Sequence, residues 1–449
     1  MNHKKEPIIL FIGDILVLFL SLWLTLLIRF RDPLNFKLFV DHLTPFAILF
    51  AISILIFFIA GLYEKHTVLY KGKLPQIILN SQITNAVVAI SLFYFFPHFI
   101  VAPKVTLFIY LVISSLLISW WRMKGVSRFE TKKKEISIVI GRGPEIDEMV
   151  KEINNNSRYG IFIDEVIDPD TLPSHYDIKQ MLESAKVNNI SLFIIDTANE
   201  KTKVFLEAFY RMIFSGVRFV DSRELYEEVF GRVPLSLVDY DWFLSNISLY
   251  PKPIYSLVKR IMDILISGIL GLISLIFYPF VYLVIKIEDK GPLFIFQDRI
   301  GKGGKRIRIV KFRSMSRNDN AEDYDNKVVE NKVTKVGSFL RKTRIDELPQ
   351  LWNVFKGDLS LIGPRPELPK PVELYEKEIS YYNVRHLITP GLSGFAQIYH
   401  ENPSHHSFEI NEAKNKLSYD LFYIKNRSLI LDLKITLRTI KILLTFVGR

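Results

Sequence analysis

The chain has no cysteine among its 449 residues. Disulfides, thiolate zinc sites and a cysteine nucleophile are therefore excluded. A small-residue cleavage site is also missing after the first apolar run, which we interpret as an uncleaved anchor and not a signal peptide. Any catalytic group must come from oxygen or nitrogen side chains.

Two glycine-rich turns lack the residues that would complete a nucleotide-binding motif. The turn Gly301–Gly304 is not followed by the Gly-Lys-Ser/Thr of a Walker loop. Gly141 and Gly143 begin a dinucleotide fingerprint, but Ile146 occupies the third glycine position, where glycine permits close helix–strand packing. A structural or regulatory role is therefore favoured for that region over nucleotide binding.

The chain has an excess of positive charge and of apolar residues. Its formal net charge is +11 and 49% of its residues are hydrophobic, concentrated in the first quarter. The Lys and Arg residues flank apolar spans, which favours an anionic membrane surface or phosphate substrates as partners and argues against nucleic acid. The length allows about three domains.

Four apolar runs come first, and each approaches the roughly 20 residues that a membrane-spanning helix needs. They are Ile8–Ile28, Leu43–Tyr63, Ile77–Phe96 and Val105–Trp121. Eleven Lys and Arg residues flank one side of these runs and four flank the other. By the positive-inside rule, the N-terminus and everything after Trp121 should be cytoplasmic. The sequence predicts four transmembrane helices within residues 1–125.

Residues 132–250 have the pattern of a Rossmann-like α/β domain. Buried strands are predicted at Ile136–Gly141, Ile161–Asp168, Ser191–Asp196 and Val217–Asp221. Helical spacing separates some of them, as in 179–188 and 203–214. Strands that alternate with helices predict a parallel, doubly wound sheet.

A fifth apolar run, Ile261–Ile287, opens the predicted third domain, residues 251–449. Pro279 lies within the run, and proline removes a helix hydrogen bond, so we expect a kink there. Lys259 and Arg260 precede the run, and Lys286 and Lys290 lie at its other end. Positive charge at both ends fits a re-entrant helix over about 257–287, but a kinked ordinary span fits the residues equally well.

The next segment, Gly291–Met315, predicts a β-hairpin around the glycine-rich turn. Four polar side chains of this hairpin are candidates to bind phosphate on one face: Gln297, Arg299, Lys311 and Arg313. Arginine binds phosphate in a bidentate manner, and lysine adds a point charge.

The adjacent pair Asp346-Glu347 supplies the candidate reactive groups. Asp346 begins a predicted helix that runs to Phe355, so it should lie at the partially positive helix end, near Arg341 and Arg344. Both effects should favour its ionised form. An ionised Asp can attack phosphorus, while Glu347 and a hard cation such as Mg²⁺ neutralise a diphosphate. Arg365, between two prolines, is a further phosphate-binding candidate.

An ordered set of motifs carries a resemblance to a known family. The set is Lys259-Arg260-x-x-Asp263, a proline within the fifth run, Gly291-Pro292-x₄-Gln297-x-Arg299-x-Gly301, Lys311-Phe312-Arg313-Ser314-Met315, Leu340-Arg341, Ile345-Asp346-Glu347-Leu348-Pro349-Gln350, Gly363-Pro364-Arg365-Pro366 and Pro390-Gly391-Leu392-Ser393-Gly394. The region from Lys252 to Phe446 resembles the bacterial sugar transferases, which are monotopic phosphoglycosyl transferases. With its four leading spans, the chain resembles the polyprenyl-phosphate hexose-1-phosphate transferase subgroup. Tyr278 departs from the pattern, because several relatives carry Ser before the proline.

The resemblance implies an enzyme that moves a sugar 1-phosphate from a UDP-sugar to undecaprenyl phosphate and releases UMP. It implies Asp346 as the nucleophile, Glu347 as the residue associated with Mg²⁺, and a re-entrant fifth helix. The expected location is the bacterial inner membrane, with soluble domains on the cytoplasmic face, and the expected role is the first membrane step of exopolysaccharide, capsule or O-antigen synthesis. The alternatives are a non-catalytic scaffold or a membrane-anchored sugar-nucleotide dehydratase. The transferred sugar and a homo-oligomeric state are left open.

Overall fold

The structure of the chain is a computed structural model and is mostly helical. It describes residues 6–30, 36–63, 74–95, 104–125, 134–156, 159–170, 190–204, 209–210, 213–214, 216–247, 252–288, 291–316, 332–399 and 409–444. The chain divides into two compact units, residues 1–222 and 223–449. The three predicted domains remain a prediction, and each compact unit is described by itself.

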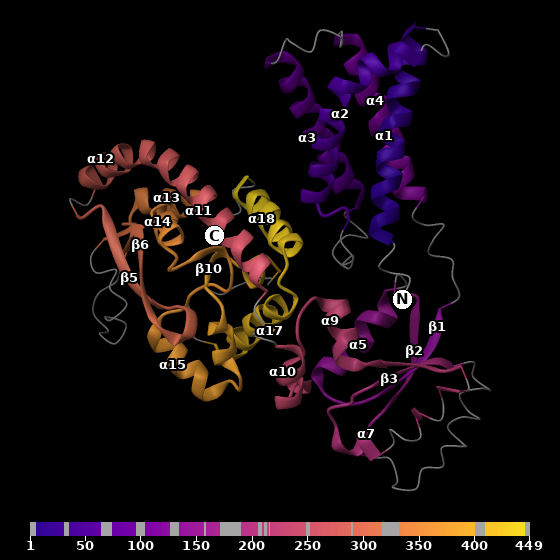
Figure 1. Ribbon diagram of the computed structural model, residues 1–449, viewed down its shortest axis with the longest axis vertical. Coiled ribbons are helices and arrows are strands. Elements are labelled where there is room, and N and C mark those ends of the chain that lie inside the picture. Colours follow the sequence, from indigo (N-terminus) through magenta and orange to yellow (C-terminus); the bar gives the residue numbers. More distant parts are fainter. Residues whose placement is uncertain are drawn as a thin grey trace. The chain divides into compact units, whose positions relative to one another are not determined.

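Four apolar helices form near the N-terminus, as predicted (Figure 1). They are α1 (Glu6–Phe30), α2 (Phe36–Ile59), α3 (Leu74–Phe95) and α4 (Lys104–Trp120), followed by a π-helical turn (Trp121–Gly125). One buried cluster draws on all four helices through Leu18, Phe46, Ile78 and Tyr110. By length and composition each helix is sufficient to cross a membrane.

Several polar side chains that are buried among these helices pair with one another. Asp14 of α1 is fully buried and pairs with Arg122, and Tyr63 Oη donates to Asp14 Oδ2 at 2.6 Å. Ser53 Oγ donates to Asn85 Oδ1 at 2.9 Å, which joins α2 to α3. A buried polar group needs such a partner because desolvation otherwise costs free energy.

A four-stranded parallel sheet follows, as the strand pattern predicted. The strands are β1 (Glu135–Ile140), β2 (Ile161–Ile167), β3 (Ile190–Ile195) and β4 (Arg218–Asp221), in the order β2-β1-β3-β4. Helix α5 (Pro144–Asn155) follows β1, and α7 (Glu200–Val204) follows β3. The predicted helix 179–188 and part of the predicted helix 203–214 lie outside the described residues.

The second unit begins with three short elements: α9 (Ser222–Phe230), a 3₁₀ turn (Leu235–Leu237) and α10 (Tyr240–Asn246). Val233 and Trp242 are buried in one cluster with Val372, Leu417 and Leu421. Residues 223–247 therefore pack on the C-terminal unit, although the predicted domain boundary lies at residue 250.

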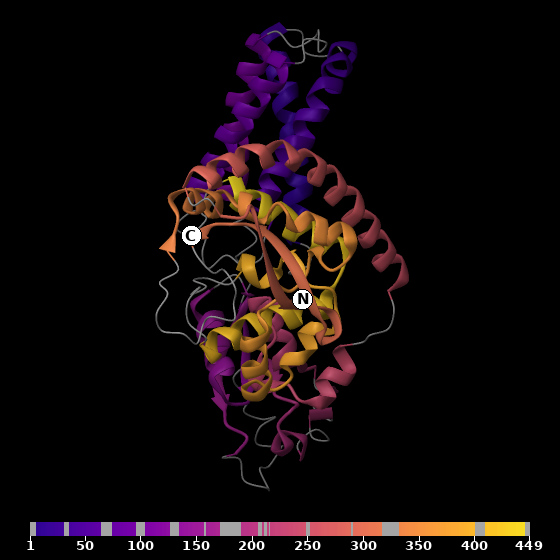
Figure 2. The ribbon, with the colours of Figure 1, turned by 90° about the vertical axis from the view of Figure 1, so that its left-hand side faces the viewer.

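The fifth apolar run forms two helices joined by a 3₁₀ turn. Helix α11 (Pro253–Ser274) leads through Leu275–Phe277 into α12 (Tyr278–Glu288), whose second residue is Pro279. Figure 2 shows the pair as an arch along this unit. The predicted interruption is therefore present, and the Tyr278 ring packs against Phe312 with centroids 4.8 Å apart.

The burial pattern of α11 is the reverse of that in a soluble helix. Its buried residues are Asp263, Ser267, Gly271 and Ser274. Its apolar residues face outward, for example Leu265 and Leu272, which are 58% and 64% exposed. A helix with small and polar residues packed inward and an exposed apolar face suits contact with lipid.

The remaining elements build an α/β domain beneath this arch. The predicted hairpin is β5 (Phe294–Ile300) and β6 (Arg306–Phe312), paired antiparallel around the turn Lys302–Gly304. Then come β7 (Met315–Ser316), β8 (Lys332–Val333), α13 (Lys335–Thr343), a 3₁₀ turn (Ile345–Glu347), α14 (Gln350–Lys356), β9 (Ser360–Ile362), α15 (Pro369–Glu378), a 3₁₀ segment (Tyr382–Leu387), β10 (Gly391–Ser393), α16 (Phe395–Tyr399), α17 (Ile410–Asn426) and α18 (Leu429–Leu444).

Candidate active site

Asp346 and Glu347 lie in the 3₁₀ turn that joins α13 to α14. Helix α13 ends at Arg344, which adopts the left-handed conformation at φ 58°. Helix α14 begins at Gln350 with Pro349 as its N-cap. The predicted single helix from Asp346 to Phe355 is therefore two elements, because the tight turn is needed to carry the chain from one helix into the next.

Three cations converge on one oxygen of Glu347. Arg365 Nη2 donates to Glu347 Oε1 at 2.9 Å, Arg344 Nη1 lies 3.6 Å from the same oxygen, and Lys311 Nζ lies 3.9 Å from it. Burial raises the pKa of Glu347, but Arg365, Lys311 and Arg344 together outweigh it and lower the pKa to about 2. Glu347 is therefore ionised at every physiological pH and holds three cationic side chains at one place.

The carboxylate of Asp346 is buried, and one of its oxygens accepts no hydrogen bond from the described residues. The residue is 8% exposed, and Oδ1 has no hydrogen-bond partner among the described residues. Burial and then the charge of Glu347 raise the pKa of Asp346 to about 6, against the opposing effects of Lys311, Arg344 and Arg341. The predicted effect of the arginines is present, since Arg344 and Arg341 lower the pKa of Asp346, but burial and the neighbouring carboxylate outweigh it. At pH 7 the group is still mostly ionised.

The hairpin supplies polar side chains to this centre. The antiparallel register pairs Gln297 with Ile309 and Lys311 with Ile295, so Gln297, Arg299 and Lys311 share one face. Arg299 donates from Nε to Gln297 Oε1 at 3.2 Å and from Nη1 to Pro366 O at 3.3 Å. Burial lowers the pKa of Lys311 to about 8, although Glu347 opposes this shift.

Two glycine-containing motifs far apart in sequence fix the position of Arg365. Gly363 N donates to Ser393 O, and Gly391 N donates to Pro364 O, each at 2.9 Å. A Cβ at Gly391 would lie 2.1 Å from Gly363 N, so the two segments require glycine where they cross. The motif Gly363–Pro366 thus carries Arg365 toward Glu347 on a rigid backbone.

Sequence reasoning missed the buried support of Arg365. Arg385, 5% exposed, donates from Nη2 to Arg365 O at 2.9 Å and lies 2.9 Å from Asp420 Oδ2. Burial raises the pKa of Asp420 to about 6 despite Arg385. No local pattern links Arg385 to Asp420, which is 35 positions later in α17. Arg344, by contrast, was adjacent to the dyad and could have been named as a site residue.

The other predicted site residues do not all lie beside the Asp346–Glu347 pair. Arg341 stays within electrostatic reach of Asp346 in the last turn of α13. Arg313 Nε donates to Met315 O, and its guanidinium lies beside Gly291. Lys259 and Arg260 line a cavity at the start of α11, where Arg260 donates to the carbonyls of Val354 and Phe355 at 2.8 Å each.

The donor set of the dyad is compatible with a hard divalent cation. Asp346 Oδ1 is a buried carboxylate oxygen with no described partner, and Glu347 is adjacent. The described residues contain no cluster of three or more Asp, Glu or His side chains. Mg²⁺ is typically bound by one or two carboxylates together with waters and substrate phosphates, so two carboxylates are sufficient.

Comparisons with known proteins point to one family. The sequence model of the bacterial sugar transferases matches residues 254–446. The UDP-N-acetylgalactosamine-undecaprenyl-phosphate N-acetylgalactosaminephosphotransferase of Aeromonas hydrophila is 44% identical over 208 residues, 45% of this chain and 47% of that protein. The UDP-glucose:undecaprenyl-phosphate glucose-1-phosphate transferase of Caulobacter vibrioides is 37% identical over 43% of this chain and 73% of that protein. The exopolysaccharide production protein PSS of Rhizobium leguminosarum is 35% identical over 41% of this chain and 93% of that protein. The match to the Aeromonas protein thus spans about half of its length.

Proposed function

The chain belongs to the bacterial sugar transferase family, and from this premise we propose that it transfers a sugar 1-phosphate from a UDP-sugar to undecaprenyl phosphate and releases UMP. The observation that carries the proposal is the free, buried Asp346 Oδ1 beside a cluster of cations. A carboxylate kept without a hydrogen bond is poised to bond to something else.

The reaction proceeds in two displacements at one phosphorus atom. An Asp346 carboxylate oxygen attacks the β-phosphorus of the UDP-sugar, the bridging P–O bond breaks, and UMP leaves with the bridging oxygen. A phosphate oxygen of undecaprenyl phosphate then attacks the same phosphorus and breaks the bond to Asp346. The carboxylate is regenerated, and splitting the transfer into two steps lowers each barrier.

The neighbouring side chains neutralise the phosphate oxygens during both steps. Arg365, Lys311 and Arg344 carry positive charge at the place where the equatorial oxygens would lie. Glu347 keeps these cations together before substrate binds, so little reorganisation is needed afterwards. Mg²⁺, held by Asp346 and Glu347 together with the diphosphate, would supply further charge neutralisation.

We propose further that α11 and α12 form a re-entrant element, with α1–α4 as a transmembrane four-helix bundle. Both ends of the α11–α12 arch bind the same domain: Arg260 at one end contacts the carbonyls of α14, and Glu288 at the other accepts from Lys335 N and Val336 N at 2.8 and 3.0 Å. A straight span would separate these ends by the bilayer thickness. The proposed location is the bacterial inner membrane, with the dyad on the cytoplasmic face.

The test is UMP release by the full chain in membranes. A panel of UDP-sugars is supplied with undecaprenyl phosphate and Mg²⁺, because the relatives are named for different sugars, N-acetylgalactosamine and glucose. We expect one or a few sugars to give UMP and a lipid-linked diphosphate sugar. If the chain is folded and inserted and no sugar on the panel gives UMP, the proposal is contradicted. A productive sugar would also support a role in the first membrane step of a polysaccharide pathway.

A further inference from the structure

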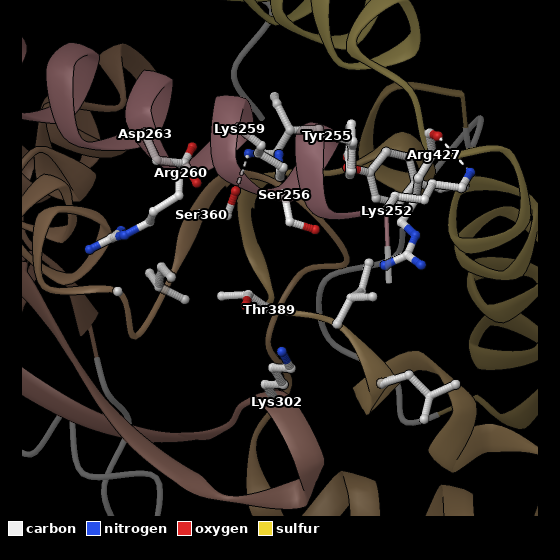
Figure 3. Close-up of a pocket in the computed structure, with 16 residues that line it drawn as sticks. Lys252, Tyr255, Ser256, Lys259, Arg260, Asp263, Lys302, Ser360, Thr389 and Arg427 are labelled. Atoms are coloured by element: carbon white, nitrogen blue, oxygen red, sulfur yellow. Dashed lines mark hydrogen bonds between the residues drawn. The ribbon is translucent and has the colours of Figure 1, made fainter. Parts of the chain in front are cut away.

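A polar cavity of about 360 Å³ lies at the start of α11. Its volume is near the lower end of the roughly 300–1,000 Å³ that small-molecule sites occupy. The first turns of α11, the hairpin turn, β9, the segment before β10 and the end of α17 contribute its walls (Figure 3). None of Asp346, Glu347, Lys311, Arg344 or Arg365 lines it.

The lining of this cavity is strongly cationic. It contains Lys252, Lys259, Arg260, Lys302 and Arg427, whereas Asp263 is its one carboxylate. Only Lys259 has a carboxylate partner among the described residues, namely Asp432 at 3.2 Å. Arg260 and Lys252 donate to backbone carbonyls, which do not neutralise their charge. Together with Lys302 and Arg427 they give the lining an excess of positive charge, which favours binding of an anion.

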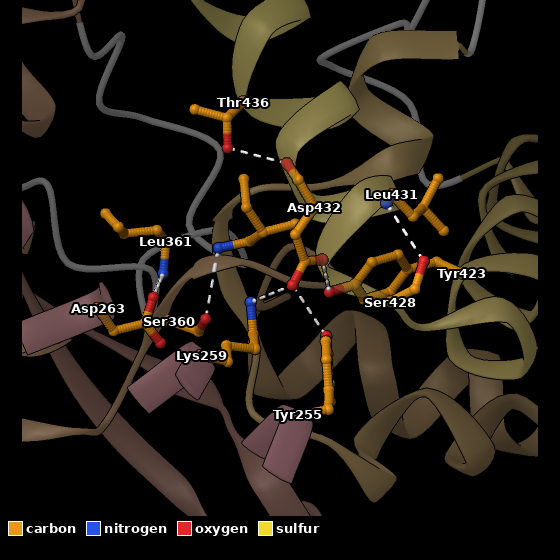
Figure 4. Close-up of polar contacts among 11 residues, drawn as sticks. Tyr255, Lys259, Asp263, Ser360, Leu361, Tyr423, Ser428, Leu431, Asp432 and Thr436 are labelled. Atoms are coloured by element: carbon orange, nitrogen blue, oxygen red, sulfur yellow. Dashed lines mark hydrogen bonds and ion pairs between the residues drawn. The ribbon is translucent and has the colours of Figure 1, made fainter. Parts of the chain in front are cut away.

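Two carboxylates, Asp263 in the lining and Asp432 beside Lys259, offset only part of the charge of the five cations (Figure 4). Asp263 Oδ1 accepts from Leu361 N at 3.0 Å. Asp432 accepts from Tyr255 Oη at 2.9 Å and from Tyr423 Oη at 2.7 Å, in addition to Lys259. These contacts fix the walls and leave the cavity itself positive.

Two side chains combine charge with an orientation toward the ligand space. Figure 3 shows Lys302 extending from the hairpin turn toward Thr389. Arg427 has a buried Nε with no hydrogen-bond partner among the described residues. Ser256 and Ser360 also line the cavity and are able to donate hydroxyl hydrogen bonds.

We propose that this cavity binds a phosphate monoester and is a site separate from the Asp346–Glu347 centre. The two sites lie at opposite ends of α14, since Arg260 contacts its last carbonyls while the dyad precedes its first turn. Seven helical residues separate the ends by roughly 10 Å. The inference does not depend on the chemistry of Asp346.

Two sources could supply the phosphate. A lipid phosphomonoester would reach the cavity along the exposed apolar face of α11, whose first turns form one wall. A soluble phosphate would enter past the exposed Lys302. Charge-assisted hydrogen bonds from lysine and arginine serve both sources alike.

The experiment measures binding to the full chain, not turnover. In the soluble arm, inorganic phosphate is titrated calorimetrically into the detergent-solubilised protein. In the lipid arm, native mass spectrometry counts phosphatidic acid retained from phosphatidylcholine nanodiscs that contain it as a minor component. Each arm compares wild type with Lys302→Gln, Arg427→Gln and the matched control Lys305→Gln, which lies in the same exposed turn but outside the cavity lining.

We expect Lys302→Gln and Arg427→Gln each to weaken binding roughly tenfold or more in at least one arm, with Lys305→Gln unchanged. The arm that responds identifies the source. Binding that is equal in wild type and both cavity variants overturns the proposal. Binding that is lost in Arg365→Gln but kept in Lys302→Gln also overturns it, because the anion would then occupy the dyad centre. Failure of UMP release would contradict the proposed function without affecting this result.

Discussion

The two ends of α14 differ in how positive and negative side chains are arranged around them. Before its first turn, Glu347 gathers Arg365, Arg344 and Lys311, and Asp346 keeps a free oxygen. At its last turn, Arg260 and three further cations line a cavity without carboxylate partners. A centre with a free carboxylate oxygen beside its cations can bind phosphate and also attack it, whereas a mainly cationic cavity can only hold it.

The largest expected effect comes from removing the nucleophile. Asp346→Asn retains the size of the side chain but removes its nucleophilic oxygen, so we expect UMP release to fall by at least ~10³-fold. The measurement is UMP formation, together with mass spectrometry for a trapped phosphosugar adduct. Asp358→Asn is the matched control, since that carboxylate lies beyond the far end of α14 and pairs with Lys356 at 3.2 Å. Full turnover by Asp346→Asn would refute the nucleophile assignment.

Glu347→Gln separates the role of the second carboxylate from that of the first. We expect UMP release to fall by about 10²-fold and the Mg²⁺ concentration for half-maximal rate to rise. Loss of this charge also lowers the pKa of Asp346 and of Lys311, because Glu347 raises both. Both limbs of the pH–rate profile should therefore move to lower pH. An unchanged Mg²⁺ requirement would exclude Glu347 as the metal-associated residue.

The wild-type pH profile should be bell-shaped. The pKa of Asp346 is about 6, so the nucleophile is protonated and the rate falls about tenfold per unit below that value. The pKa of Lys311 is about 8, so a phosphate-binding charge is lost as pH rises above it. A rate of UMP release that is constant from pH 5 to 7 would contradict the acidic limb.

Arg385→Lys tests whether the dyad depends on support from behind Arg365. Lysine keeps the charge opposite Asp420 but cannot form the same two contacts, to Arg365 O and to Asp420. We expect kcat/KM to fall about tenfold, mainly through a higher KM for the UDP-sugar, because Arg365 is the proposed phosphate ligand that Arg385 positions. If Arg385 has a purely structural role, the substitution lowers thermal stability and leaves KM unchanged. Both quantities are measured on the same samples. The control is Lys377→Arg, because Lys377 is an exposed residue of α15.

Much of this architecture was predictable because its signals are local. Apolar length predicted α1–α4, alternation predicted the parallel sheet, and the turn Gly301–Gly304 predicted the hairpin. The acidic pair and Arg365 were identified from motifs, and the structure brings Lys311 to them. The support by Arg385 and Asp420 was not predictable, because tertiary contacts between distant segments leave no spacing in the sequence. The net rise in the pKa of Asp346 was not predictable for the same reason, because burial is a property of the folded chain.

The sequence also did not predict that Lys259 and Arg260 lie apart from the dyad, because nothing in it distinguishes one cation near an apolar run from another as a phosphate ligand. Arg260 instead donates two hydrogen bonds to the last carbonyls of α14, where a positive charge also complements the helix dipole.

Arg260→Gln should therefore have the smallest effect. The change removes those bonds and lowers the free energy of unfolding by about 1–2 kcal/mol, measured by thermal denaturation against Lys356→Gln, whose cation is exposed at the same helix end. The acidic limb of the pH–rate profile should stay near 6, because Asp346 lies at the other end of α14 and Arg260 is not among the principal causes of its pKa shift. A displaced acidic limb would mean that the two ends of α14 are coupled and that the two sites act as one.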